Sequence, residues 1–121
     1  MALLAGCAGA PAESFDLSDC AQPDATDLVT VEAEDLKFNV PCIAAPAGRA
    51  FKLHFSSLDG ADHNVAIYES AAKASEHFKG ELISSGESID YPIAALAAGE
   101  YYFDCTIHPD MNGPLFAVAS D

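Results

Sequence analysis

Apolar and polar residues alternate with a period of two along several short segments of the chain. Alternation of this kind is typical of β-strands that bury one face. Turn-forming residues separate the segments, as in the predicted turn at residues 45–48. The pattern predicts an all-β fold, a Greek-key β-sandwich of seven or eight strands. The expected strands are 28–33, 36–40, 50–56, 63–68, 81–84, 88–93, 99–105 and 115–118.

One stretch departs from this alternation. Residues 69–80 contain several Ala, Ser, Lys and Glu residues and few β-branched ones, a composition with helical propensity. We therefore expect one short helix or a loop excursion in this region. The sequence contains no run of 18 uninterrupted apolar residues, so no segment is predicted to span a membrane as a helix.

The chain has 121 residues and a net charge of −14 at pH 7. This length suits a single domain with its own hydrophobic core. The negative charge argues against binding to nucleic acid or to an anionic membrane surface, because both require basic patches. It is compatible with a basic docking surface on a partner protein, and equally with an acidic surface that serves only solubility.

The N-terminal part of the chain differs in composition from the rest. Residues 1–6 are apolar, and Leu4-Ala5-Gly6-Cys7 resembles a bacterial lipobox, in which the cysteine is lipidated. A complete secretory signal has a basic region and a longer apolar run, so this interpretation places the natural start upstream. The alternative is an uncharged extension with no signal. Residues 8–27 are rich in Ala, Ser, Asp and Pro, which is typical of a tether.

This composition divides the chain into two predicted parts. Residues 1–27 are expected to be a truncated lipoprotein signal and tether, and residues 28–121 a folded domain. If Cys7 is lipidated, the lipid anchor is the only membrane contact that we expect. The corresponding location is the periplasm or another extracytoplasmic compartment.

The C-terminal part of the sequence carries three candidate metal ligands in a short loop. Cys105, His108 and Met111 follow an aromatic strand, with two residues between successive ligands. Thiolate and thioether sulfur select Cu(I), and two His with one Cys and a distant Met form blue copper centres. A second histidine is therefore required. His63 is the best candidate, since it opens an alternating strand directly after the turn-rich residues 59–62.

These residues resemble the ligand motif of the cupredoxin family of type 1 blue copper proteins. The shared pattern is a His-Asn pair at the start of a strand, here His63 and Asn64, and a downstream Tyr-x3-Cys-x2-His-x2-Met-x-Gly, here residues 101–113. Among amicyanin-like and plastocyanin-like members, the tight Cys-x2-His-x2-Met spacing is most similar to amicyanin. The resemblance covers roughly residues 29–120 and implies a cupredoxin-like β-sandwich.

The resemblance also implies a function. It identifies the chain as a mononuclear type 1 copper protein that carries single electrons on one Cu(I)/Cu(II) ion. His63, Cys105 and His108 would be the strong ligands of this copper ion. Met111 would be the weak axial ligand.

Further roles are implied beside the metal. Asn64 and Thr106 are expected to link the two ligand-bearing segments. In relatives, the later histidine reaches the surface through an apolar patch, which makes His108 the expected exit for electrons. Asp110 departs from the pattern, because an apolar residue is usual there. The implied partners are redox proteins such as cytochromes or a dehydrogenase or oxidase.

The remaining cysteines permit a disulfide. If Cys105 binds metal and Cys7 is modified, Cys20 and Cys42 are left as a pair. A disulfide between them would indicate an oxidising compartment. Two free buried thiols and other pairings stay open at this point.

Two histidines are not expected to bind metal. His54 lies on the polar face of its predicted strand, and His77 lies among charged residues with no sulfur ligand nearby. We expect no enzymatic activity, because copper oxidases and nitrite reductases of this fold need additional copper centres, and four histidines cannot supply them. The alternative function is copper storage or delivery without redox work. Such sites usually carry several Met or Cys, whereas Met111 is the only Met after the first residue.

Overall fold

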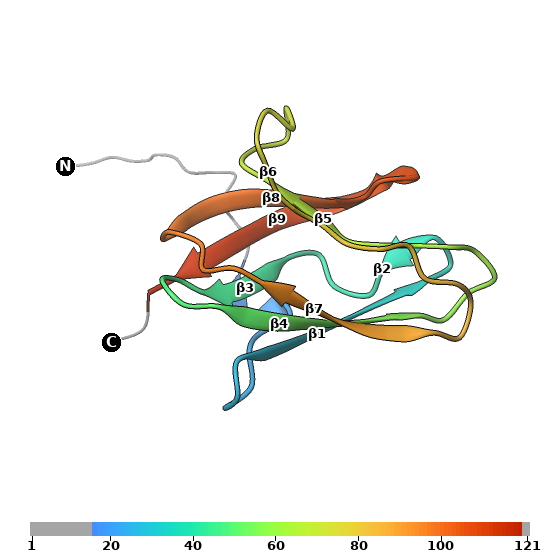
Figure 1. Cartoon of the computed structure of the whole chain (residues 1–121), viewed down its shortest axis with the longest axis horizontal. Coiled ribbons are helices and arrows are strands. Elements are labelled where there is room, and N and C mark those ends of the chain that lie inside the picture. The colour runs from blue at the N-terminus through green and yellow to red at the C-terminus, as the bar shows by residue number, and fades with distance from the viewer. Residues whose placement is uncertain (1–15, 120–121) are drawn as a thin grey trace.

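The computed structural model describes residues 16–119. Within this range, nine strands form two sheets that pack face to face (Figure 1). One sheet has four strands in the order β2-β1-β4-β7, and the other has five in the order β3-β9-β8-β5-β6. The strands are β1 (Leu28–Glu34), β2 (Lys37–Phe38), β3 (Ile43–Pro46), β4 (Phe51–Ser57), β5 (Ala66–Tyr68), β6 (Glu76–Lys79), β7 (Ser88–Ile93), β8 (Gly99–Cys105) and β9 (His108–Val118).

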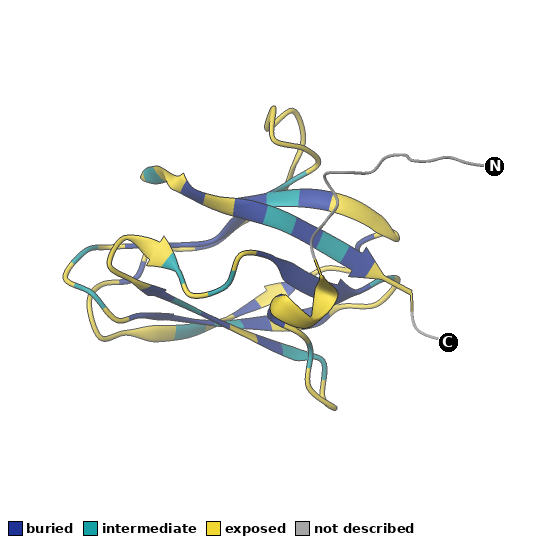
Figure 2. Ribbon diagram, turned by 180° about the vertical axis from the view of Figure 1, so that it is seen from behind, coloured by how far each residue is buried: buried dark blue, intermediate teal, exposed yellow. Residues whose placement is uncertain are grey.

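The alternating side chains of the strands form the core between the two sheets. In β4, Phe51, Leu53 and Phe55 are buried, whereas Lys52 between them is exposed. Figure 2 shows a similar change between buried and less buried positions along β9. Burial of a side chain such as Leu or Phe contributes about 1.5–3 kcal/mol, so the alternation read from the sequence is the main cause of this architecture.

The connections between strands follow a Greek-key pattern. β1 pairs in parallel with β4, and β3 pairs in parallel with β9, while the other pairs are antiparallel. The chain passes from one sheet to the other five times, at the connections β2–β3, β3–β4, β4–β5, β6–β7 and β7–β8. This arrangement confirms the predicted all-β sandwich. Four connections, β1–β2, β4–β5, β6–β7 and β8–β9, gather at the right-hand end in Figure 1.

Several element predictions need correction. Residues 45–48 are predicted as a turn, but Ile43–Pro46 forms β3. This strand lies at the edge of its sheet, where proline is tolerated because one side of the backbone has no strand neighbour. Residues 81–84 are predicted as a strand, but of these only Ile83 pairs, in an isolated bridge with His63.

The excursion predicted between residues 69 and 80 is a loop followed by a strand. Residues 70–75 form turns and bends, and Glu76–Lys79 forms β6, so the described structure has no helix here. The loop rises above β8 at the top of Figure 1. β6 pairs with β5 at the edge of the five-stranded sheet, and these ladder hydrogen bonds outweigh the modest helical propensity of the segment.

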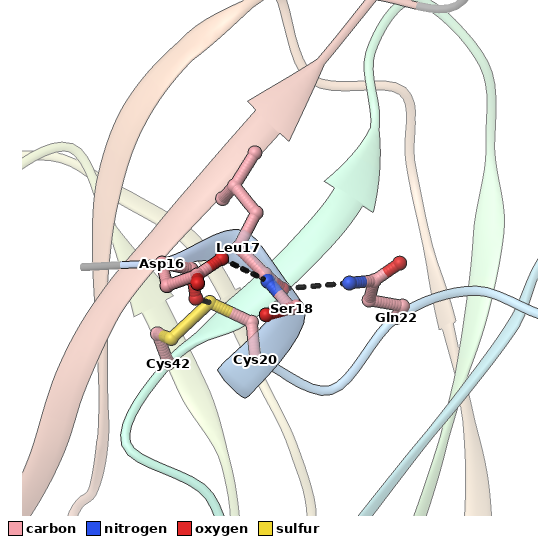
Figure 3. Close-up of a disulfide and its surroundings, with 6 residues drawn as sticks. All are labelled: Asp16, Leu17, Ser18, Cys20, Gln22 and Cys42. Atoms are coloured by element: carbon pink, nitrogen blue, oxygen red, sulfur yellow. Dashed lines mark hydrogen bonds between the residues drawn. A yellow bond between two sulfur atoms is a disulfide. The ribbon is translucent and has the colours of Figure 1, made fainter.

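The described residues before β1 are attached to the domain. A short 3-10 helix, η3 (Leu17–Asp19), precedes Cys20, and Cys20 forms the predicted disulfide with Cys42 (Figure 3). Ala21 is buried and bridges Ile43 in β3. Cys7 lies outside the described residues, and the domain boundary at residue 27 stays a prediction. Between residues 16 and 119, no helix is long and apolar enough to cross a membrane.

Candidate metal centre

The hairpin between β8 and β9 places Cys105 and His108 opposite each other. Cys105 ends β8, residues 106–107 form the turn, and His108 begins β9. The two residues are direct partners across the hairpin, and the Cys105 Sγ lies 3.6 Å from the His108 Nδ1. The two-residue turn thus brings a thiol and an imidazole together without help from the rest of the fold.

His63 reaches the same place from a distant part of the chain. It lies on the connection from β4 to β5 and is fully buried. Its backbone is fixed by two hydrogen bonds with Ile83, of 3.0 and 2.8 Å. The His63 Nδ1 lies 3.9 Å from the Cys105 Sγ, and the ring centroids of His63 and His108 are 4.9 Å apart.

The three side chains form a compact group of possible ligand atoms. All of these atoms in His63, Cys105 and His108 lie within 4.8 Å of one another. Zinc, for comparison, forms bonds of about 2.0–2.1 Å to nitrogen and 2.3 Å to sulfur, which at tetrahedral or trigonal angles separates the two donors by about 3.5–3.8 Å. The sulfur–nitrogen distances of 3.6 and 3.9 Å are therefore close to those of donors around one small ion.

A carboxylate determines which nitrogen of His63 faces the cysteine. The His63 Nε2 lies 2.8 Å from the Asp59 Oδ1. A metal-binding histidine commonly donates its other ring N–H to a carboxylate, which fixes the tautomer and the ring orientation. With the proton on Nε2, the Nδ1 lone pair points toward the Cys105 side.

Asp59 is held by several donors at once. The backbone N–H of Leu36 donates to its Oδ2 at 2.9 Å, and the N–H of Ala61 donates to its Oδ1 at 3.0 Å. These backbone hydrogen bonds, that from Leu36 above all, lower the pKa of Asp59 to about 2, with a further contribution from His63. The carboxylate is therefore ionised at neutral pH and stays an acceptor for His63.

Asn64 connects the two ligand-bearing segments. Its Oδ1 accepts hydrogen bonds from the Thr106 backbone N–H at 2.9 Å and from the Thr106 hydroxyl at 3.2 Å. Its Nδ2 donates to the Gly80 carbonyl at 2.9 Å. Because Asn64 is buried, these contacts hold the segment after His63 against the turn after Cys105.

Met111 lies in an irregular part of the same hairpin. The register of β8 and β9 shifts between Asp104 and Cys105, so residues 109–111 have no opposite partners in β8. The Asn112 Nδ2 donates to the Pro109 carbonyl at 2.9 Å across this bulge. Met111 is buried in the same apolar cluster as Cys105.

Gly113, at the end of the ligand motif, has a steric reason to be glycine in this structure. A Cβ atom at Gly113 would lie 2.5 Å from the backbone oxygen of Pro41 and 3.2 Å from the Phe103 ring. Because a backbone oxygen cannot move aside as a flexible side chain can, only glycine fits where β9 passes Pro41.

The other histidines have different surroundings. His54 pairs with Asp90 on the outer face of the four-stranded sheet, and His77 pairs with Glu69 at a distance of 2.6 Å. Neither belongs to the group of ligand atoms formed by the described residues. Asp59 is the site residue that sequence reasoning missed. Its signal was an acid four residues before a candidate ligand, together with the general need of such a histidine for a carboxylate or carbonyl acceptor.

Comparison with known proteins places these features in a family. The sequence model of the cupredoxin-like domain family matches residues 7–117. Amicyanin from Paracoccus versutus is 30% identical over 87 residues, which cover 72% of this chain and 62% of that protein. The chain thus matches less than two thirds of the length of this relative.

Solved structures show that the fold is shared. The crystal structure of the Paracoccus versutus amicyanin has a TM-score of 0.59 at 27% identity, covering 78% of this chain and 85% of its own. Auracyanin A from Chloroflexus aurantiacus, described as a blue copper protein, has a TM-score of 0.66 at 19% identity, covering 75% and 98% of the two chains. Reduced auracyanin from Roseiflexus castenholzii has a TM-score of 0.65 at 18% identity, covering 78% and 99%.

The donor chemistry agrees with this relationship. A thiol and two imidazoles in one mostly buried group, with a thioether on the same hairpin, fit one type 1 copper ion. Because the family model matches most of its length and the fold is shared, the chain belongs to the family of cupredoxin-like domains.

Proposed function

We propose that this protein is a type 1 copper electron carrier that shuttles single electrons between redox partners, with no catalytic activity of its own. The observation that carries the proposal is the meeting of His63, Cys105 and His108, whose possible ligand atoms lie within 4.8 Å of one another. His63 and Cys105 lie 42 positions apart in the sequence. Their convergence in a buried place indicates a built site.

Each proposed ligand has a separate role. The Cys105 thiolate is the strong ligand, His63 and His108 supply equatorial nitrogens, and Met111 supplies the weak axial sulfur that tunes the potential. A copper ion bound by such donors accepts and returns one electron.

The contribution of the chain is to keep these donors in place. The Asp59 carboxylate orients the His63 ring, and Asn64 joins the two ligand-bearing segments. Both contacts involve side chains that are mostly or fully buried. Ligands held in this way rearrange little when the charge of the site changes, which favours fast electron transfer.

His108 is the proposed exit for electrons. His63 is fully buried, whereas His108 is partly exposed. The surrounding end of the sandwich presents large apolar side chains, although the acid Asp110 follows His108 by two positions. The exposed side chains are Leu36, Leu58, Leu82 and Ile107. The backbone of Leu36 contacts Asp59, and Leu58 directly precedes Asp59. Leu82 precedes Ile83, which bridges His63, and Ile107 precedes His108. A partner protein can therefore dock on an apolar surface close to the His108 ring.

The net charge of −14 suggests the kind of partner. A redox protein with a basic docking surface, such as a cytochrome or a dehydrogenase or oxidase, would be attracted over a long range and would associate faster at low ionic strength. Nucleic acid does not fit this charge.

The proposed location is periplasmic or otherwise extracytoplasmic. The Cys20–Cys42 disulfide supports an oxidising compartment. Lipidation of Cys7, and the division into a tether of residues 1–27 and a domain of residues 28–121, remain part of the proposal. Mass spectrometry of the protein purified from its native membrane fraction tests the lipid.

Copper loading tests the proposed function. Purified protein, first shown to be free of zinc because zinc can bind the same donors, is titrated with Cu(II). We expect an intense blue thiolate-to-copper absorption band at one copper per chain. Cys105→Ser should abolish the band, and His108→Ala should shift or weaken it. His54→Ala is the matched control and should leave the band unchanged, since His54 lies on the opposite sheet.

The same preparation separates electron transfer from storage. An electron carrier should be bleached by a reductant and regain its colour on oxidation over many cycles, with copper retained. A store or delivery protein would release Cu(I) to a competing chelator or to an acceptor protein after reduction. No blue band at all in metal-free protein that has been supplied with copper would contradict the electron-carrier function.

A further inference from the structure

A buried carboxylate lies directly before the proposed copper ligand Cys105. Asp104 is fully buried in β8, between Ala66 of β5 and Asn112 of β9. Successive side chains of a strand point to opposite faces, so the Asp104 carboxylate lies on the outer face of the five-stranded sheet while the Cys105 thiol points into the core. Asp104 has no part in the proposed ligand set, in the orientation of the ligands or in the exit for electrons.

The loop between β5 and β6 covers this carboxylate. The Lys73 Nζ lies 2.7 Å from the Asp104 Oδ2. Apart from this ion pair, neither Asp104 oxygen accepts a hydrogen bond in the described part of the chain. Figure 1 shows the loop standing on the outer side of β8. Asp104 therefore depends on a single cation for its compensation.

Lys73 is placed for this contact by its backbone. It has a positive φ of 60°, an uncommon conformation for a residue other than glycine, and its N–H donates to the Ser70 carbonyl at 2.9 Å. The Nζ also lies 5.7 Å from the centre of the Tyr68 ring, within the range of a cation–π interaction. The turn at residues 70–73 thus directs an otherwise surface-exposed lysine onto the sheet.

The charges of this pair act on neighbouring groups. Burial, and next the negative charge of Asp104, raise the pKa values of Tyr68 and Tyr102, whereas the positive charge of Lys73 lowers them. Contact with the carboxylate raises the pKa of Lys73. The charges of Asp104 and Lys73 therefore affect Tyr68 and Tyr102 on the same face of the sheet.

The same field extends to the proposed copper site. Consecutive Cα atoms are about 3.8 Å apart, and charges inside a protein are screened much less than charges in water. The oxidised site carries one more positive charge than the reduced site. A lone negative charge at Asp104 would therefore favour the oxidised state, and a cation beside it would offset that preference.

We propose that the Lys73–Asp104 ion pair sets the reduction potential of the copper site, with Lys73 cancelling a buried negative charge next to Cys105. This inference rests on the proposed function. Neither residue binds the metal. Both act on it from the opposite face of β8, and the loop of residues 69–75 is the element that holds the compensating cation.

Redox titration of copper-loaded variants tests the inference. The potential is followed by the blue band, with all variants compared at the same pH and ionic strength. We expect Lys73→Met to lower the potential and Asp104→Asn to raise it, with the double variant between them. Lys73→Arg should restore a value near that of the unmodified protein. Lys52→Met is the matched control, because it removes one exposed positive charge from the other sheet, and it should leave the potential nearly unchanged.

A second measurement needs no copper. Alkaline spectrophotometric titration of the tyrosines in the metal-free protein should show higher tyrosine pKa values in Lys73→Met and lower ones in Asp104→Asn. If the tyrosine values shift in this way while the potential of Lys73→Met equals that of Lys52→Met, the pair is only a latch for the loop and the inference is wrong. Absence of the blue band in the unmodified protein would instead remove the proposed function, and this inference with it.

Discussion

The Nε2 of His63 and the Oδ1 of Asp59 are 2.8 Å apart, and this contact fixes the ring of the most deeply buried candidate ligand. Asp59 is in turn held by backbone N–H groups of Leu36 and Ala61. The orientation of one proposed ligand therefore depends on the hairpin between β1 and β2 as well as on its own loop. This dependence explains why the site belongs to the folded sandwich and not to a short peptide.

Removal of this acceptor should weaken the copper site. Asp59→Ala leaves the His63 Nε2 without its partner, and loss of such a contact typically lowers metal affinity by about 10- to 100-fold. Competition with a copper chelator measures the affinity. Asp62→Ala is the matched control, since Asp62 is an exposed acid in the same loop. Equal affinities of the two variants would show that Asp59 does not orient the ligand.

The tie between the ligand segments should contribute to stability. Asn64→Ala leaves the Thr106 N–H and the Gly80 carbonyl without their partner, and a buried group that loses its hydrogen bond costs about 1–3 kcal/mol. Urea unfolding of the metal-free protein measures this loss. Thr106→Val removes only the 3.2 Å hydroxyl contact and should cost less. A larger effect of Thr106→Val than of Asn64→Ala would contradict this account.

The disulfide should stabilise the fold without affecting the metal site. Cys20 and Cys42 are 22 residues apart in the sequence, a loop length for which chain entropy predicts about 3 kcal/mol of stabilisation. They pack in a small cluster of their own with Ala44 and Phe116. The double change to alanine should lower the unfolding midpoint and leave the blue band unchanged. A changed band would mean that the disulfide shapes the ligand hairpin.

Tyr91 should make stability fall at high pH. Burial raises the pKa of Tyr91 to about 12, from an ordinary value of 10.0, because the folded state favours the neutral phenol. Its stabilising contribution is therefore complete below pH 10.0 and is lost as the pH rises from there through about 12.

Comparison of the unmodified protein with Tyr91→Phe isolates this contribution. The variant loses the 2.6 Å hydrogen bond from the Tyr91 hydroxyl to the Glu81 carbonyl, so it should be less stable by about 1 kcal/mol near neutral pH. Above pH 10.0 the difference between the two proteins should shrink, as followed by denaturant unfolding. A constant difference up to pH 12 would contradict the assigned pKa.

Much of the fold was readable from local patterns. Alternation in residues such as Phe51, Leu53 and Phe55 predicts a strand with one buried face, and the structure has that strand. The edge strand β3 was missed because Pro46 is typical of a turn, and its place beside β9 depends on residues far away in the sequence. The region 69–80 was ambiguous, because only the exposed edge of β5 decides that Glu76–Lys79 becomes a strand.

The candidate site divides in the same way. Cys105, His108 and Met111 could be named as candidate ligands from the sequence, since their spacing within one hairpin limits the distances between them. Asp59 could not be identified with the same ease, because its role depends on the direction of the His63 ring and on a hydrogen bond from the β1–β2 connection.

By itself, the sequence determined the strand pattern, the acidic charge and the donor types, since these follow from residue identity and from spacing over a few positions. Only the tertiary structure decided that His63 meets Cys105 across 42 positions, that Asp59 orients it, and that Lys73 covers Asp104. Such contacts are products of sheet pairing and packing. Their distances are fixed when the two sheets close on a common core, and no short stretch of sequence carries that information.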